Sequence, residues 1–122
     1  MSDGDTSIAE LRQLVAAFVA ERDWQQFHTP KNLSMALAGE AAELMEHFQW
    51  LEREEVADRL ADPAFRQAVA EEVADVCAYL LSFVNATGLD LSTALREKMQ
   101  KNAAKYPAPE YRGRHTRPRD VE

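Results

Sequence analysis

The 122-residue sequence is poor in the residues that cross-link, bend or break a chain, with one cysteine, four glycines and five prolines. A single cysteine, Cys77, excludes an intrachain disulfide, and its apolar neighbours Val76, Ala78 and Leu80 predict a small core residue rather than a reactive thiol. The low content of glycine and proline excludes a low-complexity or collagen-like chain. The composition therefore indicates one globular domain in a reducing compartment.

The sequence also lacks long apolar runs and any excess of positive charge. No run approaches the roughly 20 apolar residues that span a bilayer, and the first six residues are polar and acidic, unlike a signal peptide. The formal net charge of −7 disfavours binding to a phosphate backbone. We therefore expect a cytoplasmic protein that binds neither membranes nor nucleic acid. A small polyanionic substrate remains compatible with this charge where divalent cations neutralise clustered carboxylates.

Hydrophobic residues recur at helical spacing along four long segments, and no β-hairpin pattern occurs. A capping residue precedes each segment, and proline follows at the first helical position after Thr29 and after Asp62. Gly88 supplies a C-terminal cap for the third segment. The predicted helices run from about Ser7 to Arg22, Pro30 to Leu51, Pro63 to Thr87 and Leu91 to Tyr106.

Short connections between these helices predict an all-α fold, an antiparallel bundle of four main helices. Residues 52–61 form a charged connection in which we expect a short surface helix. Pro107 and Pro109 end the last helix, and the sequence beyond them is polar, rich in arginine and without periodicity. The chain is therefore predicted to consist of a folded domain at 1–107 and a flexible or partner-facing tail at 108–122.

Two pairs of acidic residues recur in matching register on consecutive predicted helices. Glu40 and Glu43 lie about 60° and about 120° from the apolar stripe of the second helix, and Glu72 and Asp75 hold the same positions on the third. When the two stripes pack together, the four carboxylates converge along the border of the shared core. Such carboxylates repel one another unless a cation neutralises them, so the pattern predicts a site for Mg²⁺, with Mn²⁺ as a substitute.

Two other interpretations of these acids stay open from the pattern alone. They are ordinary solvated side chains, as most acidic residues are, or ligands of a di-iron bundle, which needs an E-x-x-H element that the sequence lacks. His47 lies in the angular sector between Glu40 and Glu43. It is either an extra polar group near the metals or a partly exposed, hydrogen-bonded histidine.

Basic and aromatic residues supply other groups that suit a nucleotide. On the last helix the apolar face continues as Lys98, Asn102 and Lys105, which fits a phosphate chain, although lysine stems leaving the end of a bundle explain it equally well. Aromatic side chains in the first loop and at helix ends either anchor the core or stack on a base. These aromatic positions are Trp24, Phe27, His28, Trp50 and Tyr106.

Six short motifs follow one another along residues 7–107. They are Arg22–His28, Pro30–Leu33, Gly39–Leu44, Phe48–Trp50, Glu71–Val76 and Lys98–Asn102, followed by Tyr106-Pro107. Together they resemble the all-α nucleotide pyrophosphohydrolases of the MazG type, and most of all their dCTP pyrophosphatase branch. The resemblance implies Mg²⁺-dependent hydrolysis of a nucleoside triphosphate, with dCTP or a modified dCTP expected, to the monophosphate and pyrophosphate in a homodimer or homotetramer.

The resemblance also implies roles for particular residues. The implied metal ligands are Glu40, Glu43, Glu72 and Asp75, and Glu71 is a neighbouring acid that we count with them as catalytic. The residues implied near the base are Trp24, His28, Asn32 and Trp50. Those near the phosphates are Lys98, Asn102 and Tyr106, to which the basic stripe adds Lys105.

A non-catalytic helical adaptor is the alternative hypothesis. In it the acids only decorate the surface, and the arginine-rich tail binds a partner. The two hypotheses differ in Mg²⁺-linked nucleotide binding, which only the enzyme requires.

Overall fold

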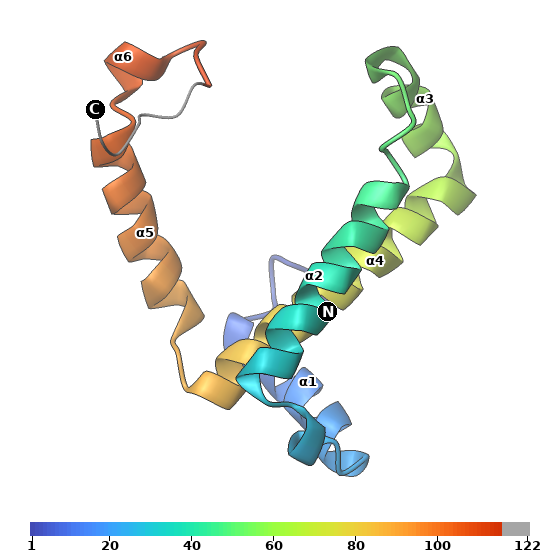
Figure 1. Cartoon of the computed structure of the whole chain (residues 1–122), viewed down its shortest axis with the longest axis vertical. Helices are drawn as coiled ribbons and strands as arrows, with labels where there is room; N and C mark the ends of the chain where they lie inside the picture. Colours follow the sequence, from blue (N-terminus) through green and yellow to red (C-terminus); the bar gives the residue numbers. More distant parts are fainter. Residues whose placement is uncertain (116–122) are drawn as a thin grey trace. The chain divides into compact units, whose positions relative to one another are not determined.

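The computed structural model describes residues 1–115, and this part of the chain contains helices and turns but no strand. The prediction of an all-helical protein is therefore confirmed. No helix within these residues is long and apolar enough to cross a membrane. The chain divides into two units, one ending at Gly88 and the other beginning at Leu89. The helices (Figure 1) are α1 (Ile8–Glu21), α2 (Pro30–Glu46), α3 (Val56–Ala61), α4 (Pro63–Thr87), α5 (Leu91–Lys105) and α6 (Ala108–Tyr111), with 3-10 turns η1 (Gln25–Phe27) and η2 (Arg53–Glu55).

The predicted capping residues Ser7, Thr29 and Asp90 cap their helices, whereas Asp62 precedes α4 without a side-chain cap hydrogen bond. The Ser7 hydroxyl accepts a hydrogen bond from the Glu10 N–H at 3.1 Å, and the Glu10 carboxylate accepts one from the Ser7 N–H at 2.8 Å. The side chains of Thr29 and Asp90 each accept a backbone N–H in the first turn of α2 and of α5. Gly88 ends α4 with φ 72°, a conformation that favours glycine. Local capping chemistry therefore sets most of the boundaries.

Helix α2 ends earlier than the apolar stripe predicts, at Glu46 rather than near Leu51. Beyond Glu46 the backbone hydrogen bonds tighten to three-residue spacing: the His47 N–H donates to the Leu44 carbonyl at 3.3 Å, and the Phe48 N–H donates to the Met45 carbonyl at 2.9 Å. Such tightened turns are common where a helix satisfies its last carbonyls. The prediction of a continuous helix to Leu51 was therefore wrong, although the chain keeps coiling.

The segment after α5 contains a short helix that the sequence did not predict. Helix α6 covers Ala108–Tyr111, so the described part of the tail is not wholly irregular. Pro109 is tolerated there because the first turn of a helix leaves its N–H groups without intrahelical partners. Residues 116–122 of the predicted flexible tail lie outside the described residues.

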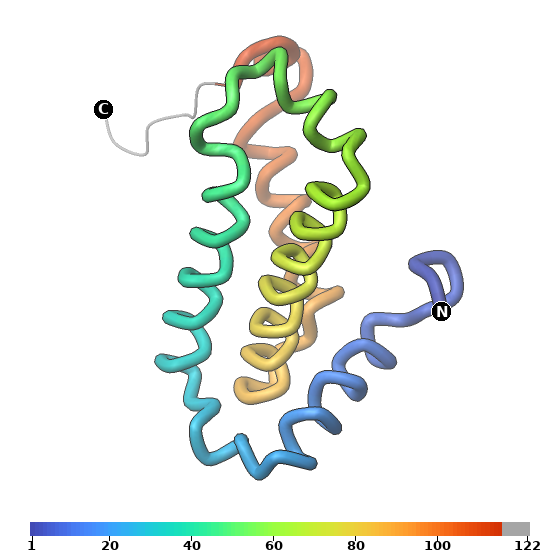
Figure 2. The backbone as a smooth tube through the Cα atoms, turned by 90° about the vertical axis from the view of Figure 1, so that its right-hand side faces the viewer, coloured from blue at the N-terminus to red at the C-terminus, as the bar shows by residue number. Residues whose placement is uncertain are grey.

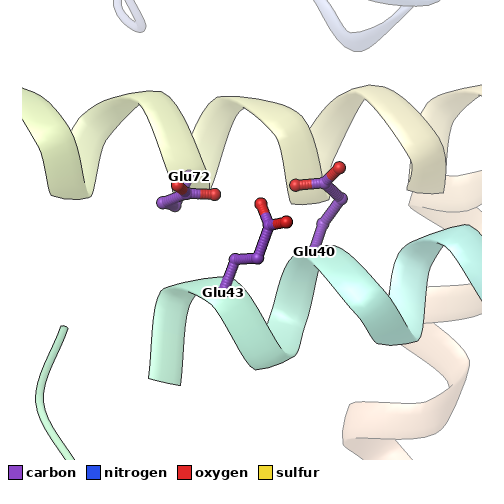
Figure 3. Close-up of side chains that lie close together, drawn as sticks. All are labelled: Glu40, Glu43 and Glu72. Atoms are coloured by element: carbon purple, nitrogen blue, oxygen red, sulfur yellow. The ribbon is translucent and has the colours of Figure 1, made fainter. Parts of the chain in front are cut away.

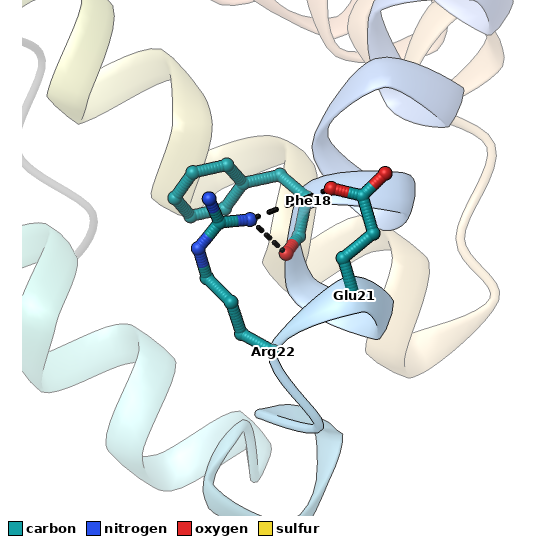
Figure 4. Close-up of polar contacts among 3 residues, drawn as sticks. All are labelled: Phe18, Glu21 and Arg22. Atoms are coloured by element: carbon teal, nitrogen blue, oxygen red, sulfur yellow. Dashed lines mark hydrogen bonds and ion pairs between the residues drawn. The ribbon is translucent and has the colours of Figure 1, made fainter.

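In the first unit α2 and α4 run side by side in opposite directions, as both views show (Figure 2). Helix α1 packs against the C-terminal half of α4, where the Arg12 Nε donates to the Asn85 side-chain carbonyl at 3.0 Å and the Asn85 amide donates to the Arg12 carbonyl at 3.1 Å. Arg22 follows the C-terminal end of α1. Its guanidinium donates to the Phe18 carbonyl at 3.0 Å and lies 3.6 Å from the Glu21 carboxylate (Figure 4).

The buried core of the described chain is small for its length. Cys77, which the sequence assigns to the core, is exposed, as are other apolar side chains of the predicted helices such as Phe18 at 49% and Val73 at 50%. Helix α4 packs against α2 and, in its C-terminal half, also against α1, so its buried residues do not follow one narrow stripe. The buried apolar residues are Val19, Leu33, Phe65, Leu81 and Val84.

Candidate functional site

Three of the predicted acids gather between α2 and α4 (Figure 3). Each of Glu40, Glu43 and Glu72 offers one carboxylate oxygen that lies within 4.8 Å of the oxygens offered by the other two. Glu40 and Glu72 are half-buried, whereas Glu43 is exposed at the rim. The group therefore combines two acids inside the helix contact with a third that is open to solvent.

The two inner acids lie on nearly the same helix faces as buried apolar residues. Counting from the buried Leu33, Glu40 falls seven residues on, which is two helical turns and almost the same face. Glu72 stands in the same relation to the buried Phe65 on α4. The two half-buried acids therefore line the contact between α2 and α4.

Burial disfavours the charged form of these two acids. One oxygen of Glu40 and one of Glu72, Oε2 in each, are fully buried without a hydrogen-bond partner among the described residues. Burial raises the pKa of Glu40, with further contributions from the carboxylates of Glu43, Asp75 and Glu72. The pKa of Glu72 is raised by burial and by Glu43 and Asp75, against a lowering by His47. Unpaired buried carboxylate oxygens beside other acids are the environment that a divalent cation relieves.

The other two acids predicted for the site lie outside this group. Asp75 is exposed, but it is near enough to raise the pKa of both Glu40 and Glu72. Glu71 is also exposed, and its carboxylate accepts a hydrogen bond from the Gln67 amide at 3.4 Å on the same helix. The structure thus places Asp75 beside the group and Glu71 on a neighbouring, solvent-facing position.

A cavity of about 460 Å³ lies between α1, η1 and the C-terminal half of α4. His28 is the one residue predicted for the base that lines it. Its remaining walls combine small apolar side chains of α1 with polar groups of η1 and α4. The lining residues other than His28 are Ala16, Val19, Ala20, Gln25, Ser82, Asn85 and Ala86.

The other residues predicted near the base lie elsewhere in the first unit. The Trp24 ring packs edge-on against Phe18 with centroids 5.8 Å apart. Asn32 holds the loop, since its amide donates to the Phe27 carbonyl at 3.0 Å. Trp50 is 86% exposed in the turns after α2.

Sequence reasoning missed Ser82, although a signal for it exists. Counted along α4 from Asp75, the residues four, seven and eleven positions on are Tyr79, Ser82 and Ala86, and all fall within about 40° of one line on the helix surface. A strip therefore leads from the acids directly to the cavity wall. The rise from Asp75 to Ser82 is about 10 Å.

In the second unit, the four residues predicted near the phosphates line one cavity. Lys98, Asn102, Lys105 and Tyr106 project from successive turns of α5 and its end, around a volume of about 460 Å³. His115, which sequence reasoning missed, also lines this cavity. The chain turns at Gly113, whose φ of 76° favours glycine, two residues before His115. The lining is dominated by cationic and hydrogen-bonding groups, which suit an anion.

Comparisons with known proteins agree with one another. The model of the MazG-like family matches residues 36–121. The chain is 41% identical over 109 residues to dCTP pyrophosphatase 1 of Bos taurus and 42% identical over 104 residues to that of Homo sapiens, covering 89% and 85% of this chain. It spans 64% and 61% of the length of those two relatives.

A solved structure is similar over nearly its whole length. The crystal structure of a pyrophosphatase from Archaeoglobus fulgidus superimposes with a TM-score of 0.78 at 35% sequence identity. The match covers 88% of this chain and 98% of the archaeal one. Fold and sequence similarity therefore extend well beyond the acidic group.

Proposed function

This chain belongs to the MazG-like family, and from that premise we propose that it hydrolyses a nucleoside triphosphate to the monophosphate and pyrophosphate. The observation that carries the proposal is the group formed by Glu40, Glu43 and Glu72, with its two buried, unpartnered oxygens. The printed names of the relatives, dCTP pyrophosphatase and pyrophosphatase, support the same reaction class.

The proposed ligands of the metal are Glu40, Glu43 and Glu72, with Asp75 beside them. Oxygen-only donors favour a hard cation, so Mg²⁺ is the expected ion and Mn²⁺ the expected substitute. These residues would hold the ion, which would neutralise their charge and supply a Lewis acid to the α-phosphate. Hydrolysis forms a bond from a water oxygen to the α-phosphorus and breaks the bond from that phosphorus to the bridging oxygen, which leaves with pyrophosphate. A carboxylate takes the proton of the water.

Two acids are candidates for holding that water, namely Glu43 and Glu71. Glu43 is exposed and belongs to the group, so an oxygen not engaged by metal faces both the acids and the solvent. Glu71 lies outside the group with its carboxylate bonded to Gln67. The geometry therefore favours Glu43 as the acid that orients the water, with Glu71 as the less well placed of the two.

The cavity beside Ser82 is the proposed site of the base. It lies along α4 from Asp75 at a distance of about 10 Å, which is comparable to the length of a nucleoside. Asn85 already uses both ends of its amide on Arg12, so Ser82, Gln25 and His28 are the polar groups that we assign to the edge of the base. The proposal of dCTP, or a modified dCTP, as substrate rests on the names of the relatives.

The cavity on α5 is the proposed binding site for phosphate groups. Lys98 and Lys105 supply positive charge, and Asn102 and Tyr106 supply hydrogen-bond donors. Trp24, Asn32 and Trp50 remain proposals for contact with the nucleotide through the loop and the turns that hold them. A cytoplasmic location is also part of this proposal, since a nucleotide substrate is compatible with it.

A homodimer or homotetramer is the proposed working unit. Few apolar residues are buried in the single chain, and large ones stay exposed on the first unit, including Leu14 at 60%, Phe18 at 49% and Met35 at 63%. Exposed apolar surface on this scale marks an interaction site. Further copies of the chain would cover it.

The test is a panel of canonical and 5-modified deoxynucleoside triphosphates incubated with the protein in Mg²⁺ or in chelator, with the products separated by anion exchange. Monophosphate plus pyrophosphate that form only with metal, and fastest for a cytosine base, are expected. Intact triphosphates throughout would contradict the proposal and favour the helical adaptor. A monophosphate accompanied by two orthophosphates would indicate stepwise dephosphorylation instead.

A further inference from the structure

His47 stands directly beside the acidic group. It follows the last residue of α2, and its backbone N–H donates to the carbonyls of Leu44 and Met45, which fixes where the side chain starts. The imidazole Nε2 lies 3.8 Å from the Oε1 of Glu72, and the two side chains are 28% and 21% exposed. The ring packs edge-on against Phe65 with centroids 5.8 Å apart. Both its position and its orientation are therefore held by neighbouring groups.

The two oxygens of Glu72 have different surroundings as a result. Oε1 faces His47, whereas Oε2 is fully buried and has no hydrogen-bond partner among the described residues. The terminal torsion of a glutamate is broad, so a carboxylate without a fixed partner presents either oxygen. Outer hydrogen-bond partners of metal-binding carboxylates orient them and set their affinity.

We propose that His47 is a positioning residue that holds Glu72 by Oε1, so that Oε2 points at the cation shared with Glu40 and Glu43. A hydrogen bond of about 3.0 Å requires the imidazole and the carboxylate to approach by about 0.8 Å. A cation on Oε2 and an N–H on Oε1 favour the same orientation of the Glu72 carboxylate, so cation binding and the histidine contact support each other. This inference rests on the proposed function, because it needs the acids to hold a metal.

Two rival roles for His47 give different results. As a ligand it would bring a nitrogen donor to an oxygen site and contact the metal itself. As a packing residue it would serve only to fill the space against Phe65, a role that any aromatic ring of similar size fulfils. The positioning role alone requires the N–H at Nε2 but no contact between nitrogen and metal.

The test compares His47→Gln, which keeps an N–H donor near the position of Nε2, with His47→Phe, which keeps an aromatic ring against Phe65. Binding of Mn²⁺ without nucleotide is measured by calorimetry at pH 8, where an ordinary imidazole is neutral. We expect His47→Phe to weaken Mn²⁺ binding about tenfold and His47→Gln to stay within about threefold of the unaltered protein. Melting temperatures in chelator show whether each variant is folded.

Glu46→Gln is the matched control, because Glu46 is an exposed acid at the end of the same helix and lies outside the group. It should leave Mn²⁺ binding within about twofold, since exposed charges are well screened. Equal or tighter binding in a folded His47→Phe would overturn the positioning role. A ¹⁴N coupling in the electron spin echo spectrum of bound Mn²⁺ that His47→Gln abolishes would show direct ligation and overturn it as well. If the unaltered protein binds no Mn²⁺, the proposed function fails instead.

Discussion

The two halves of α4 show how one helix serves two purposes. Helix α2 runs along both halves of α4, and the C-terminal half of α4 also packs against α1. The first half carries Glu72 in the contact with α2, whereas the second half holds Leu81 and Val84, which are 3% and 4% exposed. The difference teaches that the proposed metal site and the best-buried apolar residues lie in different halves of the helix, so that removing an acid and removing a core side chain should have opposite effects on activity and stability.

The largest expected effect comes from an inner acid. Glu40→Gln removes one proposed metal ligand, and because even the loss of an outer hydrogen-bond partner costs about 10–100-fold, we expect triphosphate hydrolysis to fall by more than about 100-fold. The same change removes a carboxylate whose pKa is raised by burial and by the neighbouring acids, so the melting temperature in chelator should rise. Steady-state kinetics and thermal unfolding measure the two effects.

Glu46→Gln on the same helix should change neither quantity appreciably. A Glu40→Gln variant that keeps Mg²⁺-dependent activity would remove Glu40 from the proposed site. One that melts lower in chelator would show that the carboxylate stabilises the fold, and the contrast between the halves of α4 would be lost.

A core substitution in the second half of α4 should lower stability but leave hydrolysis nearly unchanged. Leu81→Ala leaves a cavity among well-buried side chains, and we expect the free energy of unfolding to fall by about 2–5 kcal/mol in urea titrations. Hydrolysis per folded molecule should stay close to that of the unaltered protein below the unfolding transition. A selective loss of turnover in folded Leu81→Ala would show that Leu81 also supports the reaction, which would contradict the expected contrast with Glu40→Gln.

Leu14→Ala is the matched surface change, since Leu14 is 60% exposed in the single chain. For a solvent-exposed residue the expected loss is within about 0.5 kcal/mol. A larger loss that grows with protein concentration would indicate that Leu14 is covered in the proposed oligomer.

Ser82 lies in the second half of α4, between Leu81 and Val84, and lines the cavity proposed for the base, where the expected effect is smaller. Ser82→Ala removes one hydroxyl from the cavity, and the loss of a hydrogen bond worth about 1 kcal/mol predicts a rise in KM of about fivefold with kcat nearly unchanged. The control is Ser34→Ala, whose hydroxyl donates to the Lys31 carbonyl outside the cavity. If Ser82→Ala left KM unaltered for every base, the cavity beside Ser82 would not be the binding site of the base.

The features that sequence could predict are those set by nearby residues. Caps such as Ser7 and Gly88 act within one turn, so the helix starts and the end of α4 follow from local chemistry. The spacing of Glu40 and Glu72 on their helices predicted that they would face a common region. The burial of their Oε2 atoms without a hydrogen-bond partner was not predictable, because it depends on the rotation of α2 against α4.

Predicting the cavity beside Ser82 requires contacts between residues that are far apart in the sequence. Its walls come together because Arg12 and Asn85, 73 residues apart, bond α1 to the end of α4. No local pattern encodes that pairing. The spacing of Asp75 and Ser82 on one line of α4 could be calculated from the sequence. The sequence did not show that α1 lies opposite Ser82 and forms the other wall of the cavity.

The smallest expected effect is a pH dependence of stability confined to the acid-bearing half. Folding raises the pKa of Glu40 and of Glu72, chiefly by burial, so the folded metal-free protein binds more protons than the unfolded chain between the ordinary and the raised pKa values. Stability in chelator should therefore be full below the ordinary glutamate pKa, fall as pH rises through this window and level off above it. Excess Mg²⁺ should flatten the fall, because the cation replaces the protons as the neutralising charge. Urea titrations at a series of pH values measure the slope, which Glu40→Gln should reduce and Leu81→Ala should leave intact; a slope unchanged by Glu40→Gln would assign it to carboxylates other than Glu40.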